Sequence, residues 1–494
     1  MAVTNAGSTS LTFTNTPIGI QVTKITDNSG DFASIANSTY FYNKADGLVY
    51  FKNASGTVLE IFSAGGLTQF VEAENTAAPN ATVPVDSLSA SGAATNIDVA
   101  IVPKGTGALM AAVPDGLTSA GNKRGQYAVD WQMLRNANTR IASGNRSVII
   151  GGYNNGATNT YSIVGGESNQ SLGYGSVVFG INNSAFDTTG VALGNGNTIN
   201  GQSSVGLGES NTIAAGRNYA FAAGGNNSII SAGQYQTALG YFNSVSSNVS
   251  VGIGFQNTAS GFAAVALGQQ NTASGTNAFA TGTLGLASGN YSSVVGGYGS
   301  TASGITSIAG GDGCVASATS AVALGGSNAA DATSSVALGL QSSTLGIIGR
   351  NVFASGQEGT KGDSQTSKFV LRERTTGNTA TTLTTNSSAA STNNQVILSN
   401  QSAYRFKGSI VGKQSGSVNA AVWDIDGFIV RGANAAATTL NVSNVTLVQN
   451  TPAWGTPTLA ADTTNGGLQV QVTGAAATNI QWTAVIETTE VIYA

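Results

Sequence analysis

Histidines and paired carboxylates carry much of enzyme chemistry, and this sequence is poor in both. Its 494 residues include no histidine, and charged residues make up 9% of the chain. The lack of imidazole excludes Ser-His-Asp and Cys-His nucleophilic catalysis as well as histidine metal ligands. The single cysteine, Cys314, cannot form an intramolecular disulfide, so we expect it to be a small buried apolar residue.

Two aspartates in the C-terminal part are the clearest polar pair. Asp424 and Asp426 are separated by one residue, so on a strand they share a face. This arrangement suits a Ca²⁺ or sugar site, and a solvated strand edge is the alternative interpretation. Gly310-Gly-Asp-Gly313 matches a Ca²⁺-binding nonapeptide only once, and Gly194-Asn-Gly196 lacks the third glycine of a dinucleotide loop. We therefore predict no catalytic residue, no cofactor and no metal ion.

The charge pattern narrows the classes of partner. A net charge of −4 with 19 lysines and arginines leaves little to attract a phosphate backbone, so nucleic acid is not an expected partner. No run of about 18 apolar residues occurs, so membrane insertion is not expected either. The first basic residue is Lys24, and we expect no secretory signal and assembly in the cytoplasm.

A repeat of about fourteen residues fills the middle of the chain, so its strands and turns must position any functional side chains there. Short apolar runs close on glycine, as in Val265-Ala-Leu-Gly268, and asparagine often stands three residues later, as at Asn271. A coiled coil has a similar period, but each glycine inside a helix costs about 1 kcal/mol, and the apolar residues cluster once per period. We predict a β-solenoid whose coil is a strand, a Gly-x-x-Asn turn, a second short strand and an Ala-Ser-Gly turn.

The repeat also predicts an oligomer. Val265 and Leu267 share one face of their strand, while Ala266 points away. Stacked coils bury the apolar side of each against its neighbours, yet two or three sizeable side chains per coil make a thin core. We expect the second face, rich in Ala, Val and Ser, to contact another subunit, in a trimer.

A polysaccharide depolymerase would need two carboxylates within about 10 Å of each other. Glu167 and Glu209 lie three coils apart, or about 14 Å at roughly 4.8 Å per coil. The acids between residues 145 and 345 are Glu167, Asp187, Glu209, Asp312 and Asp331. We therefore predict that the protein is not an enzyme, and keep a glycosidase that assembles its acids across subunits as the alternative.

The pattern Ser-x-Val-Ala-Leu-Gly-x-x-Asn-x-Ala-Ser-Gly resembles the head repeats of YadA-type trimeric adhesins, over roughly Asn145 to Leu345. The resemblance implies a left-handed parallel β-roll in a homotrimer. A YadA-type autotransporter would also carry a signal peptide and a C-terminal membrane anchor, and we expect neither. The same repeats are found in phage tail fibres, which assemble in the host cytoplasm and need no export.

The N-terminal flank alternates like β-structure. Residues 1–65 are predicted as a β domain that attaches to the virion, with a small β domain without that role as the alternative. Its expected strands are Ser10–Thr14, Ile18–Val22, Thr39–Tyr42, Leu48–Phe51 and Val58–Phe62. Its hairpins look like those near the start of many phage fibres.

Residues 66–140 are predicted as a connector, with a linker over residues 76–84. We expect Val129–Arg135 to form one or two helical turns that feed Trp131 and Leu134 into the oligomer centre. The basic pair Lys123-Arg124 is interpreted as a solvated turn.

The C-terminal flank changes pattern. The repeats fill 141–349, a neck or linker covers 350–378, and 379–494 is predicted as an antiparallel β-sandwich, jelly-roll-like, because long alternating strands replace the fourteen-residue period. The whole is an all-β fold, expected as a homotrimeric fibre.

The expected function is that of a phage tail fibre, a structural virion component that binds a host-surface glycan such as lipopolysaccharide through its C-terminal tip. The N-terminus would join the tail baseplate or another virion protein. Flat aromatic rings and aspartates suit sugar binding, with core aromatics as the alternative, and the candidate receptor residues are Tyr404, Trp423, Asp424, Asp426 and Trp454. A tailspike-like depolymerase and a purely structural virion or capsid fibre are the alternative functions.

Overall fold

The computed structural model describes residues 26–27, 40–44, 49–52, 58–60, 70–79, 82–230, 233–452 and 454–493. The chain divides into two compact units, Met1–Val102 and Pro103–Ala494. Both are built from strands, and the only helical element in these ranges is a short 3₁₀ turn, η1 (Ala435–Ala437). The all-β prediction is confirmed.

The first unit contains two small sheets. β1 (Thr26–Asp27), β2 (Tyr40–Lys44), β3 (Val49–Lys52) and β4 (Val58–Glu60) follow one another in one sheet, with antiparallel pairing from β2 to β4. Three of the predicted strands are thereby confirmed, while Ser10–Thr14 and Ile18–Val22 lie outside the described residues. β5 (Phe70–Asn75) and β6 (Val85–Ala90) form a hairpin, and the segment predicted as a linker joins them.

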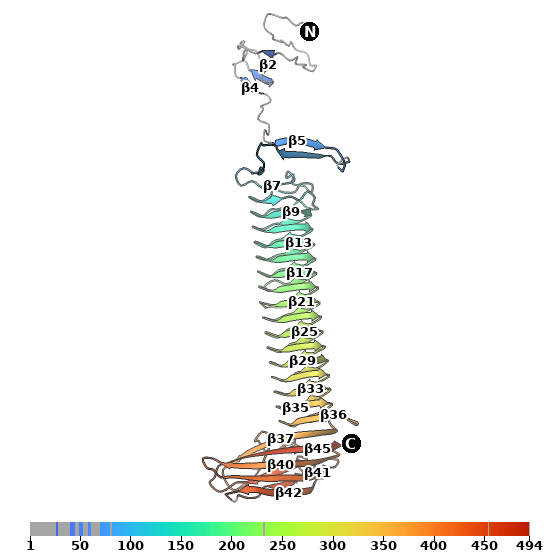
Figure 1. The fold of residues 1–494 in the computed structure, drawn as a ribbon, viewed down its shortest axis with the longest axis vertical. Coiled ribbons are helices and arrows are strands. Elements are labelled where there is room, and N and C mark those ends of the chain that lie inside the picture. The colour runs from blue at the N-terminus through green and yellow to red at the C-terminus, as the bar shows by residue number, and fades with distance from the viewer. Residues whose placement is uncertain are drawn as a thin grey trace. The chain divides into compact units, whose positions relative to one another are not determined.

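The second unit is dominated by a parallel β-solenoid of about 15 turns over residues 148–355, as the repeat predicts. The coils stack from β9 to β36 (Figure 1). Their long strands are β9 (Val148–Tyr153), β11 (Ile163–Glu167), β13 (Val177–Ile181), β15 (Val191–Asn195), β17 (Val205–Glu209), β19 (Phe221–Gly225), β21 (Thr237–Tyr241), β23 (Val251–Phe255), β25 (Val265–Gln269), β27 (Phe279–Thr283), β29 (Ser293–Tyr298), β31 (Ile308–Asp312), β33 (Val322–Gly326), β35 (Val336–Leu340) and β36 (Asn351–Ser355).

A second parallel sheet of 13 short strands completes the coils. These strands are β10 (Gly156–Ala157), β12 (Gln170–Ser171), β14 (Ser184–Ala185), β16 (Thr198–Ile199), β18 (Thr212–Ile213), β20 (Ser228–Ile229), β22 (Ser244–Val245), β24 (Thr258–Ala259), β26 (Thr272–Ala273), β28 (Leu286–Ala287), β30 (Thr301–Ala302), β32 (Val315–Ala316) and β34 (Ala329–Ala330). Pairing is in register between most neighbouring strands, with Val251 opposite Val265 and Gly254 opposite Gly268, and it shifts between β9 and β11, β27 and β29, and β29 and β31.

The glycine that closes each long strand is needed for two reasons. Gly268 has φ +112°, a conformation that side chains with a Cβ rarely adopt. A Cβ there would also lie 2.3 Å from the carbonyl oxygen of Gly282 in the next coil. Coils can therefore stack at strand spacing only if this corner has no side chain.

The solenoid core is made mostly of alanine, which corrects one expectation. Ala266 on the long strand and Ala273 on the short strand are completely buried, whereas Val265 and Leu267 point outward and are only partly covered. The alternation was predicted, but the side that faces inward is the alanine side. Some coils bury an isoleucine or a valine, such as Ile199 and Val178, but alanine fills most of the inward positions.

The predicted helical turns at Val129–Arg135 are wrong. β7 (Leu109–Met110) and β8 (Val129–Asp130) are extended and pair in parallel with each other, and β8 pairs with β9. The backbone N–H of Trp131 donates to the carbonyl of Ile149, so the ladder of the solenoid begins here. Backbone pairing with the first coil therefore replaces the local helix. Leu134 is 68% exposed.

The C-terminal part is an antiparallel sandwich that continues the solenoid sheet. β36 pairs with β37 (Ser364–Thr375), in the segment predicted as a neck, and the sheet goes on through β45 (Ile480–Ile492), β40 (Ser402–Gln414), β41 (Ala420–Arg431) and β42 (Thr438–Asn450). A smaller sheet contains β38 (Ala380–Thr382), β39 (Val396–Ile397), β43 (Thr458–Asp462) and β44 (Gly467–Thr473). Aromatic and aliphatic side chains of both sheets form one core.

Candidate functional site

The outward side of the long strands forms an extended apolar surface. Alternation places the first and third residues of each strand there, and in-register stacking aligns them in columns. We call this surface the aliphatic face; it includes Val177, Phe179, Val191, Leu193, Val205, Leu207, Leu239, Val251, Ile253, Val265, Leu267, Val322, Leu324, Val336 and Leu338.

The aliphatic face is covered by no other element of the described part of the chain. Ile253 is 37% and Leu338 39% exposed, the other residues of the face are half-buried, and Phe353 on the last rung is 54% exposed. Trp131, 46% exposed, follows the same ladder at the N-terminal end. Contiguous apolar surface of this extent marks a protein–protein contact in soluble proteins.

A column of buried asparagines fixes the stacking of the coils from inside. In the coil of Asn197, the side-chain Nδ2 donates to Oδ1 of Asn183, 2.9 Å away, and to the carbonyls of Leu193 and Gly208. Its own Oδ1 accepts from the backbone N–H and the Nδ2 of Asn211. Asn197 therefore satisfies buried groups of three coils.

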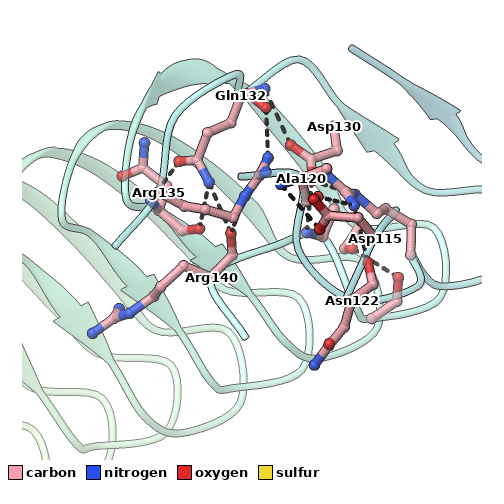
Figure 2. A network of polar contacts seen from close by, with 12 residues as sticks. Asp115, Ala120, Asn122, Asp130, Gln132, Arg135 and Arg140 are labelled. Atoms are coloured by element: carbon pink, nitrogen blue, oxygen red, sulfur yellow. Dashed lines mark hydrogen bonds and ion pairs between the residues drawn. The ribbon is translucent and has the colours of Figure 1, made fainter. Parts of the chain in front are cut away.

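A buried polar network closes the N-terminal end of the solenoid (Figure 2). Oε1 of Gln132 accepts from the backbone N–H of Asn155, so it serves as the first rung of the asparagine column. Its Nε2 donates to the carbonyl of Arg140 at 2.8 Å. Terminal coils need such a cap, because their inner polar groups have no neighbour on one side.

Arg124 belongs to this cap. The sequence predicted a solvated turn at Lys123-Arg124, but the Arg124 side chain is buried. Its Nε donates to Asp130 at 2.7 Å, and both side chains are completely buried. Its Nη1 donates to the carbonyls of Ala120 and Asn122. Burial, together with the neighbouring Arg124 charge, lowers the pKa of Arg135, whose Nη2 donates to the carbonyl of Gln132.

A second buried network joins the solenoid to the sandwich. Nη2 of Arg350, at the end of the last coil, donates to Glu490 of β45, and both side chains are completely buried. Glu490 also accepts from Gln365 of β37 and from Thr488. The ion pair links residues that are far apart in sequence, so it fixes the sandwich to the solenoid.

The predicted aromatic receptor residues lie in the sandwich core. Tyr404 is 0%, Trp423 1% and Trp454 6% exposed. The centroids of the Trp423 and Trp454 rings lie 6.0 and 5.5 Å from that of Trp482. Burial raises the pKa of Tyr404 to about 12, and the Glu490 carboxylate contributes to the shift. These rings offer no flat surface to a sugar, so the alternative interpretation as core aromatics is the one that fits their burial.

The predicted aspartates do share an exposed face, on the side of the large sheet away from the core, which we call the outer face. Asp426 forms an ion pair with Arg405 at 2.7 Å and accepts from Asn444. Hydrogen bonds from Asn444 and Arg405 lower the pKa of Asp426. Asp424 stands opposite Ser409 and Thr446 on the neighbouring strands.

In the described part of the chain, these aspartates belong to no cluster of metal-ligating side chains. No group of three or more His, Cys, Asp or Glu side chains able to hold a metal ion occurs among the described residues. In the solenoid the pairing runs from Glu167 through Ile181 and Asn195 to Glu209, which keeps the two acids three coils apart. Cys314 is completely buried, as predicted.

A cavity of about 640 Å³ opens beside the outer face, at the ends of its strands. Arg374 of β37, Gln481 of β45 and Lys413 of β40 stand in one row across three adjacent strands and line it. No aspartate or glutamate stands among the described residues that line this space, which we call the basic cavity. Composition alone does not point to it, because the three residues are far apart in sequence and meet only through strand register.

Comparisons with known proteins give no family assignment. No model of a known protein family matches the chain, and no curated protein matches it. No helix in the described ranges is long and apolar enough to cross a membrane.

Proposed function

We propose that this chain is the subunit of a homotrimeric fibre, a virion tail fibre that attaches to a host-surface glycan through its C-terminal sandwich. The aliphatic face carries this proposal. Columns of valine and leucine run along the solenoid with nothing over them in the described part of the chain, while the core behind them is mostly alanine.

Burial of the aliphatic face between copies would add the apolar stabilisation that the thin alanine core does not provide. Apolar surface removed from water contributes about 25 cal/mol per Å², and the gain grows with every added coil. A parallel solenoid has the same face along its whole length, so copies can associate side by side with their axes aligned. When the copies are arranged around one symmetry axis, the aliphatic face of every copy is covered by a neighbouring copy. The resemblance to YadA-type repeats favours three copies.

The position of the sandwich supports a role in attachment. It continues the sheet of the last coil and is held there by the buried Arg350–Glu490 pair, so force on it passes directly into the solenoid. Its outer face mixes charged residues with exposed valines such as Val370 and Val411, and no tryptophan is exposed among the described residues of this face. Recognition of a glycan would therefore rest on hydrogen bonds and charge, and three copies per fibre would add avidity. The first unit is the proposed contact with the tail or another virion protein.

The test is adsorption of the purified full chain to envelopes from a panel of bacteria, with release of reducing ends measured in the same samples. The proposal predicts saturable binding to some envelopes, competed by their isolated polysaccharide, and no release. Release of reducing ends would contradict it in favour of a depolymerase. Absence of binding across a panel that includes the host would contradict it in favour of a purely structural fibre.

A further inference from the structure

The basic cavity stands out in an acidic chain with few cations. The protein has a net charge of −4 and only 19 lysines and arginines, yet Arg374 and Lys413 line one cavity and Arg372 lies in the adjacent row of the same face. The guanidinium groups of Arg372 and Arg374 have no hydrogen bond or ion pair with any described residue. Their charge is not used within the fold.

Carboxylates near the cavity do not neutralise it. Glu373 has the alternation of buried Leu371, on the side of β37 away from the outer face, and its carboxylate accepts a hydrogen bond from the backbone N–H of Arg374 and not from its guanidinium group. Two acids of the outer face are engaged elsewhere: Glu487 lies 3.9 Å from Lys368 and 3.6 Å from Lys407, and Asp426 pairs with Arg405. The third, Asp424, stands on β41 opposite Ser409 and Thr446 and does not line the cavity. Positive charge is therefore left over at this corner of the sheet.

The side chains that line the basic cavity limit the chemical class of ligand that it can bind. Arginine presents planar paired donors that match a carboxylate or a phosphate. Gln481 and Asn479 add amides that can bind hydroxyl groups, and a volume of about 640 Å³ is in the usual range for small-molecule sites. No aromatic side chain stands among the described lining residues, so a nucleobase has nothing to stack on.

The cavity also lies where a trimer would leave it accessible. β36 pairs with β37 only at residues Thr366–Lys368, and Arg374 is six residues further along β37. At about 3.4 Å per residue, it lies roughly 20 Å beyond the last residue of β37 that pairs with β36. Packing of the aliphatic faces therefore need not cover it.

We propose that the basic cavity binds a saccharide bearing an oxyanion, a carboxylate or a phosphate, and that Arg374 and Lys413 hold this group. The inference rests on the proposed function, because it names the class of glycan that the sandwich recognises. Arg374 would contact the anion, and Gln481 and Asn479 the sugar hydroxyls. Neutral glycans of the same shape would bind poorly.

Calorimetric titration of the full chain tests this, with tri-galacturonic acid, its methyl ester, glucose 6-phosphate and glucose as the probes. The proposal predicts binding of at least one anionic probe, with its uncharged counterpart at least tenfold weaker; which acid binds identifies the oxyanion. Arg374→Gln and Lys413→Gln should each weaken binding at least tenfold. The matched control is Lys407→Gln, on the same strand as Lys413 but outside the cavity, which should leave affinity unchanged.

Equal binding of acid and ester, equal loss in Arg374→Gln and Lys407→Gln, or no binding of any probe would overturn the proposal. Failure here is distinguishable from failure of the proposed function. If Arg374→Gln protein adsorbs to host envelopes as well as the unmodified chain does, the cavity assignment falls and the attachment role stands. If the anionic sugars bind but no envelope does, the cavity assignment stands and the attachment role falls.

Discussion

Removal of one rung of the asparagine column should open the solenoid locally, and Asn197→Ala is the perturbation that isolates this effect. The Asn197 side chain is completely buried and takes part in five hydrogen bonds across neighbouring coils. Asn195 stands in the same coil, but its side chain is exposed and forms no hydrogen bond with described residues. Asn195→Ala is therefore the matched control.

The magnitude follows from what alanine leaves behind. The Asn197 amide has two N–H groups, which share three acceptors, and their loss costs about 1 kcal/mol for each N–H. The buried backbone N–H of Asn211 also loses its acceptor, at about 1–3 kcal/mol. Asn183 keeps one partner, because the backbone N–H of Asn197 still donates to its Oδ1. We expect a total of about 3–5 kcal/mol, against about 0.5 kcal/mol or less for Asn195→Ala.

Hydrogen exchange measured by mass spectrometry is the suitable assay, because repeat proteins open locally and a single global unfolding energy would average the effect. A loss of 3–5 kcal/mol corresponds to amide exchange faster by about 100-fold to a few thousand-fold in the coils next to Asn197, since about 1.4 kcal/mol is a factor of ten. Coils far from the substitution should exchange as before. Equal acceleration by Asn197→Ala and Asn195→Ala would refute the role of the column.

Three further outcomes are expected. Glu490→Gln should destabilise the junction by about 3–5 kcal/mol in denaturant titrations, because it leaves Arg350 buried without a counter-charge. The control Glu487→Gln removes an exposed ion pair and should cost at most about 1 kcal/mol. Similar losses in the two variants would contradict the stabilising role of the buried pair. Although burial raises the pKa of Asp363, the backbone N–H groups of residues 358–360 lower it below its ordinary 3.8. The ionised Asp363 carboxylate therefore stabilises the loop of residues 358–363 above its unfolded pKa, and this stabilisation is lost as pH falls through the lower folded pKa. Amide hydrogen exchange of the loop should accelerate only below about pH 3.8. Acceleration near pH 6 would disprove the role of Asp363. Burial also raises the pKa of Cys314, so iodoacetamide should label it at pH 8 only after unfolding, and rapid labelling of the native protein would show that the core is open.

The solenoid could be predicted because its signals are local and repeated. Gly268 marks a corner where no Cβ fits, and Asn271 marks the buried amide that follows it, and each recurs many times. The inward side of the strand was not predictable by the same logic. Val265 and Ala266 are both apolar, so alternation alone does not decide which of the two faces inward, and in the fold it is Ala266.

Features that depend on contacts between residues far apart in the chain could not be predicted from the sequence. Arg124 is buried because Asp130 of β8 neutralises it, and its neighbours in sequence gave no sign of that. Trp423 and Trp454 had two interpretations, as sugar-binding surface platforms or as core residues, and their burial beside Trp482 fits the core. The basic cavity needs the register of three strands, which no pattern along the chain specifies.

The molar mass of the purified chain in solution, measured by light scattering, tests the central claim most directly. If the aliphatic face is a contact between copies, the particle should have three times the 49.3 kDa of one chain, and Leu239→Asp together with Leu267→Asp should reduce it. A monodisperse particle of 49.3 kDa would show that columns of valine and leucine can remain in water, and the proposed fibre would be contradicted.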